Sequence, residues 1–234
     1  NQLCDRLGMD TISCGNAVAA YLKANDAFGD DELIHETVQR IASREGDGDL
    51  LAEGIHRFHD ELGVEDWTVK GMTFSAHDGR TLNGQGLGFA TANRGADHMY
   101  ATFYAYEYPL VDASEAFEPS GLSAAKATKL VELENKRALE DCGVVCRFSR
   151  GVMTAERFEA LFDADLDALL DVGARVVELE RHFNNQRGFD RADDDLPYEL
   201  PDFDAALDAY YETRGWTDEG VVPGNPLGAS ASAD

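Results

Sequence analysis

The sequence predicts an all-α, multihelical fold of two domains. Apolar residues recur at helical spacing along most of the 234 residues. No stretch of useful length alternates apolar and polar residues as a half-buried strand does, and no repeat of about 20 to 50 residues indicates a solenoid or propeller. The hydrophobic share of 44% is enough for a packed core, so a globular protein is expected.

The N-terminal third predicts three helices. The first spans residues 12–24 and follows a loop with the sequence DRLGMDT. The second lies in DDELIHETVQRIAS, where acidic residues precede an apolar stripe made of Leu33, Ile34, Val38 and Ile41. The third lies in DGDLLAEGIHRFHDELG, where Asp49 can cap the start and Gly63 can end the helix. Its apolar residues recur at i, i+4, i+7 and i+11, namely Leu51, Ile55, Phe58 and Leu62.

A long, glycine-bearing stretch of weak periodicity, VEDWTVKGMTFSAHDGRTLNGQGLG, indicates a join between domains near residues 67–71. We therefore expect one domain at residues 1–69, a second at 70–223 and a mobile tail at 224–234. After the join, FATANRGADHMYATFYAYEY mixes small and aromatic residues, which favours a tightly packed helix. Further helices are predicted at residues 123–140, 154–162, 166–183 and 203–213.

The charge balance limits the possible partners and the environment. Forty-five acidic residues stand against 20 basic ones, which gives a net charge of −25 and argues against nucleic acid as a partner. Such a surface repels itself at ordinary ionic strength, whereas near molar salt the screening length falls to about 3 Å. The sequence therefore predicts adaptation to a salty cytoplasm. The alternative is an acidic tail or a docking face for a basic partner, but the acidic residues are spread along the whole chain.

Targeting signals and cysteine spacing point to the cytoplasm. No apolar run approaches the roughly 18 residues of a membrane span, and no basic-then-apolar leader is seen, so we expect no membrane segment. The four cysteines lie at separations of 10, 128 and 4 residues, which match no secreted disulfide scaffold. Reduced thiols or metal ligands remain as alternatives.

Two distant stretches share one pattern of residue types. Each has an aspartate, then a glycine or a small apolar residue, then methionine or valine, then aspartate or cysteine. The residues are Asp5, Gly8, Met9 and Asp10 in CDRLGMDTISCG, and Asp141, Val144, Val145 and Cys146 in DCGVVCRF. A purely structural interpretation is also open, in which the first two aspartates cap the following helix and Asp141 ends the preceding one.

The two stretches are part of a series of six short sequence segments that occur in a fixed order along the chain. They are DRLGMDTIS, VKGM followed by AHDGR, GLGFATANRGADH, DCGVVCRF, ERHFNNQRGFDRADDDLP and LDAYYETRGW. Together they resemble the aldehyde:ferredoxin oxidoreductase family from about residue 5 to 223. In that family the pattern Asp-x-x-Gly-Leu-(Cys or Asp) occurs twice, and each copy holds one of two pterins that chelate a single tungsten. The resemblance thus implies the helical C-terminal part of such an enzyme, with tungsten or molybdenum.

The resemblance implies a pterin receptor at each motif. Asp5 and Asp141 would accept adjacent N–H donors from the pterin edges, because an ionised carboxylate is an acceptor-only group. Gly8 would let the backbone approach a flat ring closely. The cofactor-binding residues implied in this way are Asp5, Gly8, Met9, Asp10, Thr11, Asp141 and Val145. Val144 stands in the glycine position of the second motif, where a positive φ is difficult for valine, so we expect Gly143 to supply that freedom.

Cys146 matches the family's fourth ligand to a [4Fe-4S] cluster. Such clusters need four thiolates, and the family's upstream CxxCxxxC run is not in this chain. The other three ligands are expected N-terminal to Asn1, on a missing N-terminal domain of the same enzyme. The remaining cysteines, Cys4, Cys14 and Cys142, are then expected to be small buried residues.

His98, in RGADH, matches the family histidine near the tungsten. It would hydrogen-bond or transfer a proton at a metal-bound oxygen or the substrate carbonyl; the alternative is a core histidine bonded to a backbone carbonyl. The resemblance implies aldehyde oxidation to a carboxylic acid, with electrons passed through the cluster to ferredoxin, and a possible homodimer. This piece alone is expected to be inactive.

Two other classes of protein stay open. One is a helical binding or structural module that has kept the family shape without the cofactor. The other is a di-iron helical bundle, which needs paired Glu-x-x-His helices, whereas the sequence shows a single such motif at Glu53 and His56. A solvated polar face explains that motif better than a metal site does.

Overall fold

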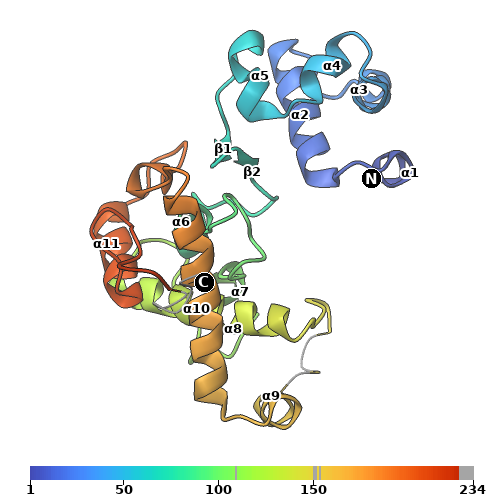
Figure 1. Cartoon of the computed structure of the whole chain (residues 1–234). Coiled ribbons are helices and arrows are strands. Elements are labelled where there is room, and N and C mark those ends of the chain that lie inside the picture. Colours follow the sequence, from blue (N-terminus) through green and yellow to red (C-terminus); the bar gives the residue numbers. More distant parts are fainter. Residues whose placement is uncertain (109, 150–151, 153, 227–234) are drawn as a thin grey trace, which may run out of the picture. The chain divides into compact units, whose positions relative to one another are not determined.

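The computed structural model describes residues 1–108, 110–149, 152 and 154–226 (Figure 1). Within these residues it has eleven α-helices, one 3-10 helix and a two-stranded hairpin, so the all-α prediction is confirmed. Two compact units divide the chain. The first consists of residues 1–76 with 94–97, and the second of residues 77–93 with 98 onward. The domain limits expected from the sequence stay a prediction.

Five helices and the hairpin make up the first unit. The helices are α1 (Gln2–Leu7), α2 (Thr11–Ala24), α3 (Asp31–Ser43), α4 (Asp47–Leu51) and α5 (Ile55–Leu62). The hairpin pairs β1 (Thr68–Val69) with β2 (Met72–Thr73) in antiparallel fashion. Its turn residues, Lys70 and Gly71, both have positive φ, as a tight two-residue hairpin turn requires. Strands of two residues are too short to leave an alternating pattern in the sequence.

Side-chain caps and apolar burial explain α2 and α3. Asp10 accepts a hydrogen bond from the Ser13 backbone N–H at 2.6 Å, and Asp30 accepts one from the Leu33 N–H at 2.9 Å. The apolar faces of the helices enclose a core of Cys4, Cys14, Ala17, Val18, Leu22, Val38, Ile41, Leu51, Ile55 and Phe58.

Three expectations for this unit are wrong. The segment DRLGMDT, expected as a loop, begins inside a helix: its residues 5–7 belong to α1, which ends at Gly8. The segment expected as one helix is split into α4 and α5, because Gly54 adopts a φ of 88° that a continuous helix cannot contain. Asp49 does not cap a helix start; it forms an ion pair with Arg44 at 2.6 Å. Gly63 ends α5 with a φ of 63°, as predicted.

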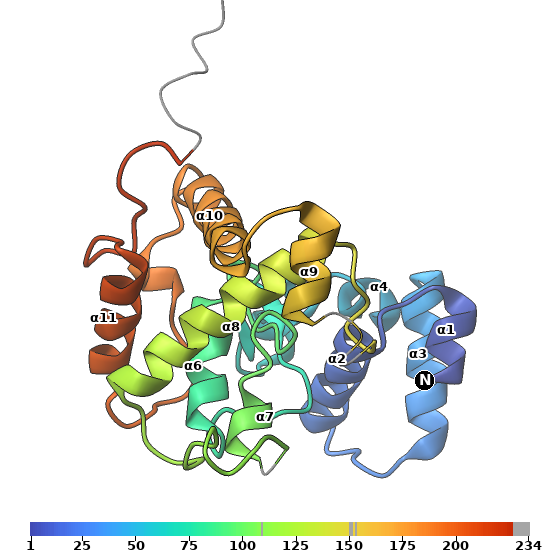
Figure 2. The ribbon, with the colours of Figure 1, turned by 90° about the horizontal axis from the view of Figure 1, so that it is seen from below.

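The second unit is arranged around one long helix, α8 (Ala124–Cys142). The other elements are α6 (Asn83–Thr91), α7 (Tyr104–Glu107), α9 (Ala155–Phe162), α10 (Leu166–Asn185), η1 (Arg191–Asp193) and α11 (Phe203–Arg214). In Figure 2, α11 lies near the N-terminal end of α8 and α9 lies beyond its C-terminal end. Helix α10 packs closely on α8 at Gly173, where an added Cβ would come within 2.1 Å of the Asn135 carbonyl oxygen.

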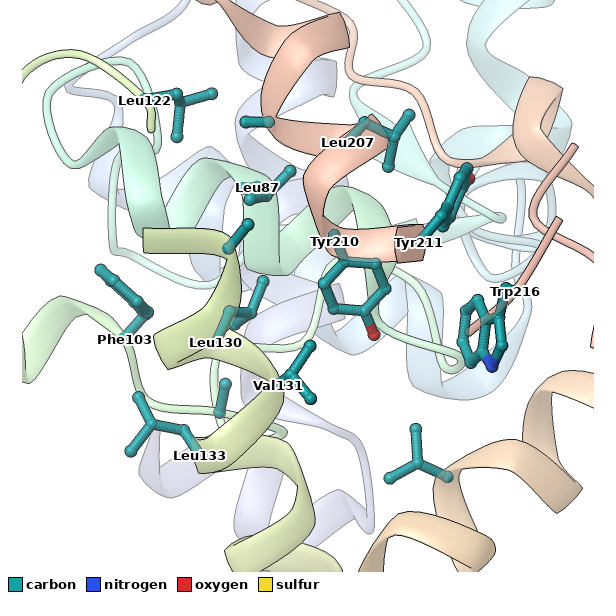
Figure 3. Close-up of a cluster of buried hydrophobic side chains, with 14 of the residues drawn as sticks. Leu87, Phe103, Leu122, Leu130, Val131, Leu133, Leu207, Tyr210, Tyr211 and Trp216 are labelled. Carbon is teal, nitrogen blue, oxygen red and sulfur yellow. The ribbon is translucent and has the colours of Figure 1, made fainter. Parts of the chain in front are cut away.

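Aromatic and aliphatic side chains fill the space between α6, α8 and α11 (Figure 3). Tyr210 is fully buried and its hydroxyl donates to Glu134 at 2.7 Å, while Arg214 pairs with the same carboxylate at 2.5 Å. The rest of the core consists chiefly of Leu87, Phe103, Leu122, Leu130, Val131, Leu133, Leu207, Tyr211 and Trp216. Burial of these apolar surfaces is the main stabilising contribution of the unit.

The four helices predicted at residues 123–140, 154–162, 166–183 and 203–213 are present with ends shifted by at most two residues. Ser123 caps α8 by accepting from the Lys126 N–H at 3.3 Å. The expected helix at residues 89–108 is wrong: only the end of α6 and the four residues of α7 are helical there. Helix α6 instead begins at Asn83, inside the stretch expected to join the domains.

Of the tail expected to be mobile, residues 227–234 lie outside the described residues. Across the described ranges, none of the helices combines the length and the apolar character that a membrane span needs.

Candidate functional site

A pocket of about 420 Å³ in the second unit brings together residues from four segments. The segments are residues 98–106 before and in α7, residues 110–111, the C-terminal half of α8, and the loop that follows α8. His98, Val145 and Cys146, which have separate predicted roles, all line this pocket. We call residues 98–103 the His98 segment, residues 141–147 the second motif loop and residues 5–11 the first motif loop.

His98 lies in a group of three rings. The His77 ring is stacked on Tyr104 with centroids 3.9 Å apart, and it is tilted against His98 at 5.1 Å. Burial, together with the neighbouring His98, lowers the pKa of His77 below its ordinary value. A neutral His77 therefore adds no positive charge beside His98 near neutral pH. His98 itself is half-buried and reaches the pocket wall, a position from which an imidazole can exchange protons with a bound group.

Ion pairs join the walls of the pocket. Glu140 Oε2 accepts from Arg137 Nη1 at 2.5 Å and from Arg147 Nη1 at 3.0 Å. Arg137 Nη2 donates to Thr102 Oγ1 at 3.1 Å, and Arg147 Nη2 pairs with Asp141 Oδ2 at 3.0 Å. These side chains run from the His98 segment across α8 to the second motif loop.

The lining is basic although the chain is strongly acidic. Lys136, Arg137 and Arg147 line the pocket, while Glu140 is the acidic residue among its lining. Among the described residues, Lys136 makes no ion pair with a carboxylate. In a chain of net charge −25, such a pocket favours anions, including carboxylates.

The backbone of the second motif loop differs from expectation. Gly143 has a φ of −81° and continues the end of α8, whereas Val144 takes the positive φ, 54°. Glycine at position 143 therefore matters for packing and not for an unusual backbone angle, since a Cβ there would come within 3.2 Å of the Phe158 ring. The Val144 side chain itself is 92% exposed.

The cysteines fall into two kinds. Cys4 and Cys14 are buried in the first unit, as predicted, and burial together with Cys4 raises the pKa of Cys14 to about 12. The Cys14 thiol therefore stays protonated at neutral pH. Cys142 is exposed, so its expected burial is wrong; it is the last residue of α8 and points away from a packed core. Cys146 is exposed as well, and it lines the pocket.

The first motif loop lies in the first unit and is open to solvent. Asp5 is exposed within α1, and Gly8 ends that helix with a φ of 72°. A Cβ added at Gly8 would have no atom within 4 Å, so the space above it is free. Asp10 caps α2, and Thr11 is the first residue of that helix.

The structural interpretation of the acidic residues is therefore correct in part. Asp10 is a cap, and Asp141 lies in the last turn of α8. Asp5 caps no helix, because it lies inside α1. The exposed carboxylates of Asp5 and Asp141 stay available to a ligand in either interpretation.

Comparison with known proteins shows which family the chain belongs to. Residues 1–227 match the family described as aldehyde ferredoxin oxidoreductase, domains 2 and 3. The tungsten-containing aldehyde ferredoxin oxidoreductase of Pyrococcus furiosus is 31% identical over 97% of this chain and 44% of its own length. The enzyme of the same name from Thermococcus kodakarensis is 30% identical over 95% of this chain and 43% of its own length. The chain belongs to the aldehyde ferredoxin oxidoreductase family.

The family match places the chain in the C-terminal part of such proteins. It spans less than half the length of the curated relatives it matches, and the family match is to domains 2 and 3. The active site complex BamBC of benzoyl coenzyme A reductase, solved with 1,5-dienoyl-CoA, has a TM-score of 0.68 over 91% of this chain and 42% of its own. At 16% identity that likeness concerns the fold alone.

The family's cofactors fit the residues present to different degrees. Two exposed aspartates and the open space at Gly8 suit the N–H edge of a pterin. For metal, no group of three or more His, Cys, Asp or Glu side chains within the described part of the chain is arranged to hold an ion. A cluster at Cys146 would need its other thiolates from elsewhere.

Several site residues were missed in the sequence. His77 stands in the block AHDGR, which carries part of the resemblance, but a single histidine gives no sign of its ring partners. Arg137 and Glu140 are three residues apart on α8 and Arg147 lies in the loop beyond it, so all three look like solvated charges until the fold brings them together.

Proposed function

We propose that this chain is the C-terminal part of an enzyme that oxidises aldehydes to carboxylic acids. The enzyme uses a tungsten or molybdenum bis-pterin and passes electrons through a [4Fe-4S] cluster to ferredoxin. The observation that carries the proposal is the shared pocket, in which the predicted acid–base histidine and the predicted cluster cysteine line one wall each. Family membership makes this chemistry the first to test.

Each residue has a defined task under this proposal. Asp5 and Asp141 hold the pterin edges, with Gly8, Met9, Asp10, Thr11 and Val145 around the rings, and Cys146 supplies one cluster thiolate. The bound metal-pterin group supplies the two-electron oxidation. His98 holds or moves a proton at the substrate's carbonyl oxygen.

The pocket charge agrees with the product of this reaction. Aldehyde oxidation turns a neutral carbonyl group into a carboxylate. Arg137, Arg147 and Lys136 stabilise that negative charge within the pocket, where partial burial weakens the screening by water.

Metal content tests the proposal directly. The intact protein is expected to contain about one tungsten or molybdenum and about four irons per chain by elemental analysis. A helical module without cofactor would contain neither.

Asp141→Ala is expected to lower the metal and pterin content, because it removes the acceptor for one pterin edge. Asp171→Ala is a matched control, since Asp171 is an exposed aspartate on α10, and it should leave the content unchanged. Equal content in both variants would remove Asp141 from the site.

Two further features of the proposal concern assembly. The remaining cluster ligands and the N-terminal domain are proposed to belong to the same enzyme, because the chain corresponds to under half of its relatives' length. A homodimer, a cytoplasmic location and adaptation to high salt stay proposals from the sequence.

A further inference from the structure

Four hydrogen bonds and ion pairs form an unbroken path between the two sides of the pocket. The path begins at Thr102 in the His98 segment, passes through Arg137 and Glu140 on α8, and reaches Asp141 through Arg147. Every contact along it measures between 2.5 and 3.1 Å. Glu140 is the centre, because one of its carboxylate oxygens accepts from both arginines.

Partial burial makes this path more than a set of surface charges. The side chains of Glu140, Arg147 and Arg137 are 13%, 17% and 26% exposed, whereas Asp141 at the end of the path is 65% exposed. In the Lys129–Glu132 pair on the same helix the glutamate is 60% exposed, against 13% for the central Glu140. Half-buried charges are screened less by water and salt, so their geometry is held more firmly than that of a surface pair.

Both ends of the path have a backbone that needs support. Thr102 has a φ of 54°, and Val144, in the loop that Asp141 begins, has the same value. Among the described residues outside glycine, these are the two β-branched positions with positive φ. Such conformations persist where surrounding contacts fix them. At one end, the Thr102 hydroxyl accepts a hydrogen bond from Arg137. At the other end, Arg147 pairs with Asp141 in the second motif loop.

We propose that Glu140, Arg137 and Arg147 are positioning residues that couple the second motif loop to the His98 segment. Ordering of either end then fixes the other, so that the cofactor loop and the proton-exchanging histidine are set together. The roles given to the two ends of the path rest on the proposed function. The coupling between the ends can be measured without cofactor and without an activity assay.

Hydrogen exchange of the intact protein, followed by mass spectrometry, tests the coupling from each end. Thr102→Val keeps the side-chain shape but removes the acceptor for Arg137. It is expected to speed exchange in the second motif loop, at the opposite end, by about threefold or more. Arg147→Met is expected to do the same to the His98 segment, and Glu140→Gln to both. Reporter amides exist at each end, since Thr102 N–H bonds to the His98 carbonyl and Val145 N–H to that of Glu140.

Matched variants separate coupling from general loosening. Glu132→Gln breaks another Lys or Arg pair at i, i+3 on α8, and Thr128→Val removes an exposed hydroxyl from the same helix. Neither should change exchange at the two ends, and α10 should exchange alike in every variant. If Glu140→Gln is too unstable to measure, Thr102→Val and Arg147→Met alone test the coupling. Effects confined to the mutated end, or equal effects from the controls, would overturn the coupling while leaving the metal-content test of function untouched.

Discussion

At the residue scale, Val144 shows how the second motif departs from the first. Gly8 takes its positive φ as a glycine can, whereas the corresponding residue of the second motif takes it as a valine. A β-branched residue in this region is strained by about 1–3 kcal/mol. The side chain's 92% exposure means that no packing compensates for the strain.

Val144→Gly should therefore stabilise the protein. Relief of strain exceeds the extra flexibility of glycine in the unfolded chain, so the free energy of unfolding is expected to rise by about 1 kcal/mol. Denaturant titration at neutral pH measures this change. Val221→Gly provides the control, because Val221 is also exposed but has an ordinary negative φ, and there the same substitution should destabilise. A loss of stability at both positions would show that Val144 carries no strain.

At the element scale, α6 shows which parts of the fold the sequence could not predict. Helices α3, α8, α10 and α11 have apolar residues at helical spacing and follow prediction closely. Helix α6 begins with NGQG, a poor helical sequence. Its first N–H groups, from Gly84 and Gln85, donate to the buried carboxylate of Glu107 at 2.7 and 3.0 Å. That cap comes from more than 20 residues away, so no local pattern could reveal it.

The glycines of α6 follow from its position. A Cβ at Gly84 would come within 2.3 Å of the Phe103 ring, so glycine is required for the approach of these segments. Residues that weaken the helix as a local structure therefore allow its tertiary packing. The break at Gly54 has a different basis: a Cβ there would meet no atom within 4 Å, and its φ of 88° ends the helical backbone although the apolar spacing continues.

Glu107→Ala should destabilise the second unit strongly. Glu107 also pairs with Lys126 at 2.6 Å, and the side chains are 0% and 4% exposed. Removing the carboxylate leaves a buried ammonium and two uncapped N–H groups, which is expected to cost about 3–5 kcal/mol in urea denaturation. Glu132→Ala, which breaks the surface pair with Lys129 on the same helix, should cost less than about 1 kcal/mol. Similar losses in the two variants would contradict the role of burial.

At the scale of the whole molecule, three of the residues named from the sequence come together. His98, Val145 and Cys146 line one pocket, while their roles stay predictions. The ordered blocks of the resemblance made it possible to name these residues, since each short motif alone had a structural explanation. The basic lining was not predictable, because Lys136, Arg137 and Arg147 are three of the 20 basic residues and only the end of α8 brings them to one side.

The net charge leads to a prediction for the entire chain. At −25, the acidic residues repel each other more in the compact state than in the unfolded one. Potassium chloride at molar concentration shortens the screening length to about 3 Å and should remove most of that repulsion. The melting temperature is therefore expected to rise from low salt to molar KCl, with the steepest change at the low end. The half-buried pairs around Glu140 should contribute little to this change, since water and salt screen them less.

An equal osmolality of sucrose serves as the control, because sucrose stabilises by exclusion from the surface and does not screen charge. A melting temperature that is flat in KCl, or that rises equally in sucrose, would contradict adaptation through charge and favour an acidic face reserved for a basic partner.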